Sequence, residues 1–213
     1  MRSQTAKRKR RRSLSLDLRY SIDVATTPAF YPVSRAEVKR HLKVDHDDDN
    51  TYIDGLIAAA TAVIERRTAR QFINATFDLY MDRFPVCDTF QLPYGNLQSI
   101  GIIGYYDENG STQTFASTNY QVDTKSLLGR VALEPSAVWP STELERLNAV
   151  RVRFTCGYGS SYAAIPQDAK QACFFLIGHW WEHREPVMVG MNVIDIKDTL
   201  DSLVWKFRIP ELH

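Results

Sequence analysis

The chain has 213 residues, 44% of them hydrophobic, and a formal net charge of +1. This length and composition suit one domain with a buried core, or one domain with an insertion. No apolar run approaches the roughly 18 residues that a membrane span requires, so we expect no membrane partner. The cysteines lie far apart without a Cys-x-x-Cys pair. This pattern argues against a disulfide framework and favours a reducing compartment.

The near-neutral charge hides a basic N-terminal segment. Residues 1–13 contain seven bases and no acid, whereas the rest of the chain contains 19 bases and 25 acids, a net charge of −6. Consecutive cations repel one another and bury no core, so we expect residues 1–27 to form a flexible arm. Such an arm can contact DNA phosphates or an acidic protein, or it can be only a solubilising tail. The bases concerned are Arg2, Lys7, Arg8, Lys9, Arg10, Arg11 and Arg12.

Two helices are predicted after the arm. Ser34 and Glu37 have the spacing of a capping box at the start of a helix over residues 35–42. An acidic stretch over residues 45–50 precedes a second helix near residues 51–70, where carboxylates favour the positive end of the helix dipole. The apolar stripe of this second helix is Ile53, Leu56, Ile57, Ala60 and Ile64.

The hydrophobic pattern changes to a period of two near Ala75. Asn109-Gly110 lies between two strand-like stretches, residues 97–106 and 112–115, which is a strong signal for a β-hairpin. Three more short strands are predicted over residues 120–123, 130–133 and 150–155. We therefore expect residues 75–163 to form an inserted antiparallel β region.

A third helix is predicted over residues 167–183, because Pro166 suits the first helical turn and Pro186 stops the pattern. The segment that follows, residues 187–213, is rich in apolar side chains but has no evident place in a compact core. An apolar tail of this kind more often docks onto another chain than stays in solvent. The side chains that we expect to dock are Leu200, Leu203, Val204, Trp205 and Phe207.

One pattern on the third helix resembles a metal site. His179, Glu182 and His183 match His-x-x-Glu-His, and two histidines at i and i+4 share a helix face that could bind zinc. A zinc hydrolase is therefore one interpretation of the chain. So short a match also arises by chance, and no third ligand is evident, so two histidines at the solvent edge of core tryptophans are the simpler interpretation.

A second pattern resembles a calcium loop, because Asp45, Asp47 and Asp49 alternate before a helix. Asn50 and Leu56 stand where such a loop requires glycine and a bidentate glutamate, so we expect no calcium site. No cysteine or serine lies in a nucleophile motif. We therefore predict no catalytic residue, no metal ligand and no cofactor.

Two groups of motifs resemble a known family. The first is Pro-Val-Ser-Arg-Ala-Glu-Val-Lys-Arg-His-Leu-Lys-Val-Asp at residues 32–45, followed by three aspartates and a helix starting Tyr52-Ile53. The second is Asn-Ala-Val-Arg-Val-Arg-Phe at residues 148–154, Gly-Tyr-Gly at 157–159, Ile165-Pro166, and Gly-His-Trp-Trp-Glu-His-Arg-Glu at 178–185. In this order and spacing, residues 32–186 resemble the head–tail connector, or adaptor, family of tailed bacteriophages.

The resemblance implies a structural protein without catalytic residues. Members of that family form a ring, usually of twelve subunits, beneath the portal of the capsid and around the DNA channel. The implied partners are other copies of the chain, the portal protein, a downstream neck or tail-completion protein, and packaged DNA. The implied location is the neck of the virion, after synthesis in the cytoplasm of the bacterial host. The basic arm departs from the family pattern, so a nucleic-acid-binding protein remains the main alternative.

The expected fold class is α+β. A small helical bundle, residues 28–74 with 164–186, carries the β insertion over 75–163 and two extended arms over 1–27 and 187–213. Subunits of one kind in a ring make heterologous contacts. We expect charge to pair across this lateral contact, with Asp45, Asp47, Asp48 and Asp49 of one subunit facing Arg66, Arg67 and Arg70 of the next.

Overall fold

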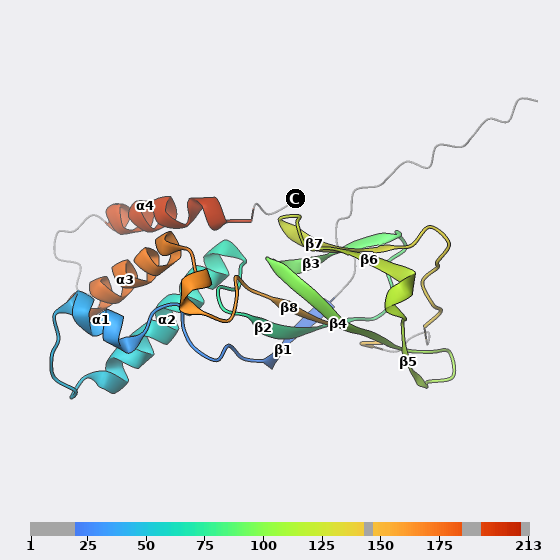
Figure 1. Cartoon of the computed structure of the whole chain (residues 1–213), viewed down its shortest axis with the longest axis horizontal. Coiled ribbons are helices and arrows are strands. Elements are labelled where there is room, and N and C mark those ends of the chain that lie inside the picture. The colour runs from blue at the N-terminus through green and yellow to red at the C-terminus, as the bar shows by residue number, and fades with distance from the viewer. Residues whose placement is uncertain (1–19, 143–146, 185–192, 210–213) are drawn as a thin grey trace, which may run out of the picture.

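The computed structural model describes residues 20–142, 147–184 and 193–209, so the seven predicted arm bases lie outside the described residues. The helices gather at one end of the molecule and the strands at the other (Figure 1). The helices are α1 (Arg35–Leu42), α2 (Asn50–Thr68), α3 (Gln167–Glu182) and α4 (Val193–Val204). The predicted α+β class is confirmed. Among the described residues, no helix is long and apolar enough to cross a membrane.

Helix α1 begins where the local sequence predicts. The Ser34 hydroxyl accepts a hydrogen bond from the Glu37 N–H at 3.2 Å, and the Glu37 carboxylate accepts one from the Ser34 N–H at 2.8 Å. This reciprocal pair is a capping box, which satisfies two of the N–H groups that a helix start leaves free. The helix ends at Leu42, and the left-handed backbone of the following residue, Lys43 (φ 57°), caps its last turn.

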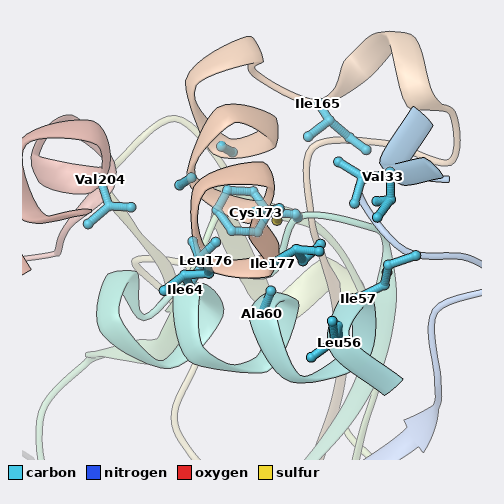
Figure 2. Close-up of a cluster of buried hydrophobic side chains, with 14 of the residues drawn as sticks. Val33, Leu56, Ile57, Ala60, Ile64, Ile165, Cys173, Leu176, Ile177 and Val204 are labelled. Carbon is cyan, nitrogen blue, oxygen red and sulfur yellow. The ribbon is translucent and has the colours of Figure 1, made fainter. Parts of the chain in front are cut away.

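The helical core forms between α2 and α3 (Figure 2). The predicted stripe of α2, with Ile57, Ala60 and Ile64, is buried against Cys173 and Ile177 of α3. Ala60 is fully buried, and its small side chain lets the two helix backbones approach closely. The helix pairing therefore follows from the apolar period of the sequence.

The strands form two antiparallel sheets rather than the one small sheet that the sequence predicts. The larger sheet has the order β1 (Tyr20–Thr26), β2 (Ala75–Met81), β8 (Val150–Cys156), β4 (Leu97–Tyr106), β5 (Thr112–Thr114). The smaller sheet has the order β3 (Thr89–Gly95), β7 (Leu128–Leu133), β6 (Tyr120–Asp123). Buried side chains from both sheets, such as Phe154 and Phe90, belong to one apolar cluster. The β region is thus a two-layer unit with its own core.

Strand β1 corrects the predicted extent of the flexible arm. Residues 20–26 pair with β2, and Tyr20 lies opposite Met81 in the register. Ile22 packs on the core of the β region, whereas Tyr20 and Val24 are 43% and 55% exposed. The alternation of apolar and polar residues suits the edge of a sheet, which explains why this part of the arm is ordered.

The C-terminal segment is a second correction, because residues 193–209 of it fold back onto their own subunit. Helix α4 packs along α3, and Leu200, Val204 and Phe207 are at most 5% exposed (Figure 1). Ile209 N–H donates to the Thr68 carbonyl at 3.2 Å, which fastens the chain beyond α4 to the end of α2. Helix α4 is amphipathic, and its apolar face covers apolar surface on α2 and α3. This removes apolar surface from water and so stabilises the folded chain.

The carboxyl group of Glu65 lies where the last turn of α2 meets the following loop. It accepts hydrogen bonds from Gln71 Nε2 at 2.7 Å and from the Phe72 N–H at 3.1 Å. Burial raises the pKa of Glu65 from 4.5 to about 7, although both hydrogen bonds oppose the shift. The folded protein therefore holds a proton here that the unfolded chain releases at lower pH.

This raised pKa predicts a pH dependence of stability. Between pH 4.5 and pH 7 the native state binds more protons than the unfolded state, so Glu65 lowers the free energy of unfolding as pH rises through this window. We expect Glu65→Gln to flatten that fall and to be more stable than the wild type above pH 7. Urea titrations at several pH values measure the difference, with Glu108→Gln, an exposed carboxylate of the β4–β5 turn, as control. Parallel curves for Glu65→Gln and the wild type would contradict the prediction.

Candidate interaction surfaces

The predicted lateral charges lie at opposite ends of α2. The acidic stretch over residues 45–49 precedes the helix, and Arg66 and Arg67 lie in its last turn. A helix of 19 residues is about 28 Å long, so the two groups cannot meet within one subunit. Opposite charges at the two ends of one rigid element suit a head-to-tail contact between copies.

Two of the four predicted acidic groups already have cations beside them in the same chain. Lys39 Nζ lies 2.8 Å from Asp47, and Arg184 lies 3.8 Å from Asp49. Hydrogen bonding to Lys39 holds the pKa of Asp47 below its usual value. The imidazole of His46 lies 3.9 Å from Asp48. Asp45 is exposed and forms no ion pair within the described parts of the chain.

The basic end of α2 differs from the prediction in one residue. Arg70 is only 8% exposed, and its guanidinium donates to the Phe207 carbonyl at 2.6 Å and to Asn96 Oδ1. It therefore links the helical part, the β region and the C-terminal segment of one subunit. Arg70 lies after the end of α2, where the chain turns inward, so its guanidinium is engaged within its own subunit, and its lateral role stays a prediction.

The other two arginines lie on the surface. Arg67 forms an ion pair with Asp201 of α4 at 2.6 Å. Arg66 is exposed and has no ionic partner among residues 20–142, 147–184 and 193–209. Within the part of the chain that the structure describes, Asp45 before α2 and Arg66 in its last turn are thus an acidic and a basic side chain without an ionic partner.

The predicted docking side chains of the C-terminal segment separate into two kinds. Leu200, Val204 and Phe207 are buried in the helical core, and Leu203 is partly buried against it. Trp205 is 75% exposed. An apolar ring of this size in solvent marks an interaction site more readily than a buried leucine does. Of the five, Trp205 is therefore the side chain available to another molecule in this conformation.

The zinc pattern on α3 does not extend to a metal centre among the described side chains. His179 and His183 stack with ring centroids 4.9 Å apart, and no group of three or more potential ligands occurs in the described residues. Burial, followed by the nearby His183 charge, lowers the pKa of His179. A tetrahedral zinc site requires at least three protein ligands, which these two histidines and Glu182 do not provide in this arrangement.

One surface group escaped the sequence analysis. The Arg184 guanidinium lies 4.8 Å from the ring centroids of both Tyr52 and Trp181, which joins the start of α2 to the end of α3. Tyr52 is 36% exposed, so part of this aromatic group faces solvent. Tyr52 is far in sequence from the other two, and only the spacing of Trp181 in the last turn of α3 and Arg184 just beyond its end could have indicated the group.

Comparison with protein families identifies the chain. The profile described as head completion protein matches residues 33–188, which is most of the chain. The chain belongs to the head completion protein family. The predicted membership of the head–tail connector family is thereby confirmed, and it makes this head completion protein a structural subunit of the connector between a phage head and its tail. Among curated proteins, no sequence matches it well enough to count as a relative.

Solved structures share the fold. One is described as the neck of an empty gene transfer agent particle computed with C6 symmetry. Its matching chain has a TM-score of 0.75 and 22% sequence identity, and the match covers 91% of this chain and 97% of that chain. A chain in the virion of a native gene transfer agent particle has a TM-score of 0.76 and 22% identity over 90% and 97%. A third, from the neck of a native particle computed with C12 symmetry, has a TM-score of 0.71 and 23% identity over 91% and 97%. The head completion fold thus extends over nearly the whole chain.

Proposed function

We propose that this head completion protein assembles into a closed ring of identical subunits in the neck of a phage or phage-like particle. The observation that carries the proposal is the family match over residues 33–188. The fold is shared with chains of particles whose necks were computed with C6 and C12 symmetry, which supports a ring of twelve copies. The ring would surround the DNA channel, with the portal on one side and a downstream neck or tail-completion protein on the other.

Head-to-tail contacts between the two ends of α2 would close this ring. In a heterologous interface each subunit offers two different surfaces, and rotation brings one against the other. The unpaired Asp45 precedes α2 and the unpaired Arg66 lies in its last turn, and both side chains are exposed. The contact would place the acidic end of one α2 beside the basic end of the next.

Charge reversal tests this contact. We expect Asp45→Arg and Arg66→Asp each to weaken ring formation, because like charges then face each other at every interface. An exposed ion pair contributes about 0.5 kcal/mol to the free energy of a contact, and a ring forms the same pair at each of its contacts. The double variant restores opposite charges and is expected to recover assembly. Sedimentation and electron microscopy with and without the portal measure the ring, and Glu108→Arg is the control.

Two results of that experiment would contradict the lateral contact. One is normal assembly of both single variants at low salt, where exposed charges act most strongly. The other is a double variant that assembles no better than either single one. Circular dichroism of each variant distinguishes lost contacts from lost folding.

The basic arm supports a second activity, contact with DNA. Seven bases lie within residues 1–13, whereas the other 200 residues carry a net charge of −6. The excess of cations is therefore concentrated in one short segment. We expect the full chain to retain DNA at low salt, with affinity that falls steeply as salt rises and is independent of sequence. Deleting residues 1–13 should abolish this retention. Equal retention by the truncated and full chains would exclude the arm as the DNA contact and favour an acidic protein partner.

We also propose that the chain has no enzymatic activity. The two candidate zinc ligands, His179 and His183, do not form a group of three potential ligands with Glu182 or any other side chain of the described residues, and the three cysteines are not in nucleophile motifs. Burial raises the pKa of Cys156 and Cys173 to about 12, so neither thiol ionises readily. Stoichiometric zinc in the purified protein would overturn this part of the proposal.

A further inference from the structure

Three strongly exposed aliphatic side chains gather on two connections of the β region. Val86 is 96% exposed, Val138 78% and Leu147 76%, and with Trp205 they are the most exposed large apolar side chains of the described residues. Val86 lies between β2 and β3, and the other two lie between β7 and β8. We call these three residues the β-tip patch.

The loops that carry the β-tip patch are tied together. Trp139 stacks on Phe84 with ring centroids 5.0 Å apart, and its indole N–H donates to the Cys87 carbonyl at 2.9 Å. The Asn148 N–H donates to Asp82 Oδ1 at 2.9 Å. These contacts place the neighbours of Val138 and Leu147 against the loop of Val86. The exposed side chains therefore stand on a packed aromatic base, and their exposure does not come from an unsupported loop.

The N-terminal strand enters the sheet at the same end. Tyr20, the first residue of β1, lies opposite Met81, the last residue of β2, and Met81 lies opposite Val150 on its other side. Asp82 follows Met81 and Asn148 precedes β8, so the hydrogen bond between them lies directly beyond these pairs. Tyr20 thus lies at the end of the larger sheet that carries the loops of the β-tip patch.

The sequence before β1 continues the alternation of that strand. Apolar residues occupy Leu14, Leu16, Leu18, Tyr20, Ile22 and Val24, and polar or charged residues occupy every position between them. Alternate residues of a strand share one face. Ile22 lies opposite Leu79 and packs on the core of the β region, so the alternation assigns the three leucines to the core-facing side. Strand β2 ends at Met81 and offers them no partner.

We propose that residues 14–18 of the same chain extend β1 and cover the β-tip patch with Leu14, Leu16 and Leu18. Five extended residues span about 17 Å beyond Tyr20. Covering three exposed aliphatic side chains with three leucines removes apolar surface from water on both sides. The segment also places the basic residues 7–12 at the strand end of the subunit, away from the helices.

Two variants that place the same charge on opposite faces of the strand test this proposal in the full chain. Leu16→Asp puts a charge on the face predicted to contact the patch, and Ser15→Asp puts the same charge on the other face. Amide hydrogen exchange is measured for peptides that contain residues 82–88 and 147–149. We expect exchange there to accelerate on the order of tenfold in Leu16→Asp and to match the wild type in Ser15→Asp. Peptides from α2 verify that both variants are folded.

Three outcomes would overturn the proposal. If Leu16→Asp leaves exchange of both loops unchanged, or if both variants accelerate it equally, residues 14–18 do not cover the patch through their apolar face. Protection in the wild type that disappears on hundredfold dilution would assign the covering segment to a second copy of the chain. Protection that is independent of concentration supports the same-chain arrangement. The experiment uses the free subunit, so its result does not depend on ring formation.

Discussion

Replacing Phe207 with alanine is expected to lower the free energy of unfolding by about 3–5 kcal/mol. Phe207 is 5% exposed and meets the rings of Phe72 and Tyr158 edge-on, at centroid distances of 6.1 and 6.3 Å. Truncation would leave a cavity between the end of α2, the loop after β8 and the C-terminal segment. Urea denaturation followed by circular dichroism measures the loss.

Trp205 provides the matched control for Phe207. It is an aromatic residue two positions away, but it is 75% exposed. We expect Trp205→Ala to change the free energy of unfolding by less than about 0.5 kcal/mol. Equal losses for the two variants would mean that the C-terminal segment does not fold back as described. If Trp205 is the docking residue, Trp205→Ala should weaken attachment to the particle while leaving the subunit stable.

This contrast matters for any experiment on the C-terminal segment. Deleting residues 187–213 would remove Leu200, Val204 and Phe207 from the helical core as well as the exposed Trp205. Loss of attachment after such a deletion would follow from unfolding alone. The single exposed side chain therefore separates docking from stability, and the whole deletion does not.

The second large effect is expected for Arg70→Ala, with a loss of about 3 kcal/mol in the free energy of unfolding. The buried guanidinium donates to the Phe207 carbonyl and to Asn96, and hydrogen bonds from a charged group contribute about 1.5–3 kcal/mol each before relaxation. Removing it leaves both oxygens without this donor inside the protein. Thermal or urea unfolding measures the change.

Arg66→Ala is the control for Arg70→Ala, because it removes the same side chain four residues earlier from an exposed position. We expect it to alter stability by at most about 0.5 kcal/mol and to affect ring assembly instead. The two arginines should therefore show opposite phenotypes: Arg70→Ala unstable as a free subunit, and Arg66→Ala stable but poor in assembly. A stable Arg70→Ala protein would refute the linking role of this residue.

Local signals in the sequence predicted the helical part well. The capping box of Ser34 and Glu37 located α1 at its observed bounds, because both partners lie within one helical turn. The apolar period located α2 and α3, and Asn109-Gly110 located the β4–β5 hairpin, where Gly110 has a φ of 74°. Each of these features depends on residues within one turn or one helix face, so no knowledge of distant contacts is required.

Strand β3 is an element that local sequence signals did not predict. Its sequence Thr-Phe-Gln-Leu-Pro-Tyr-Gly contains Pro93 and ends at Gly95, and both residue types weaken a strand prediction. Strand β3 pairs with β7, more than thirty residues along the chain, and makes a separate sheet with β6. Only this distant pairing divides the β region into two layers, because neither strand specifies its partner in its own sequence.

The amino-acid sequence by itself determined the family, the capped start of α1, the apolar stripe of α2, the hairpin and the charge at each end of α2. Only the tertiary structure decided which charged and apolar side chains remain on the surface. Arg70 and Phe207 are 137 positions apart, yet each is buried by the other's part of the chain. Burial depends on what packs against a residue, and a residue's local neighbours do not specify that. For this reason a predicted lateral arginine and a predicted docking phenylalanine both lie in the interior.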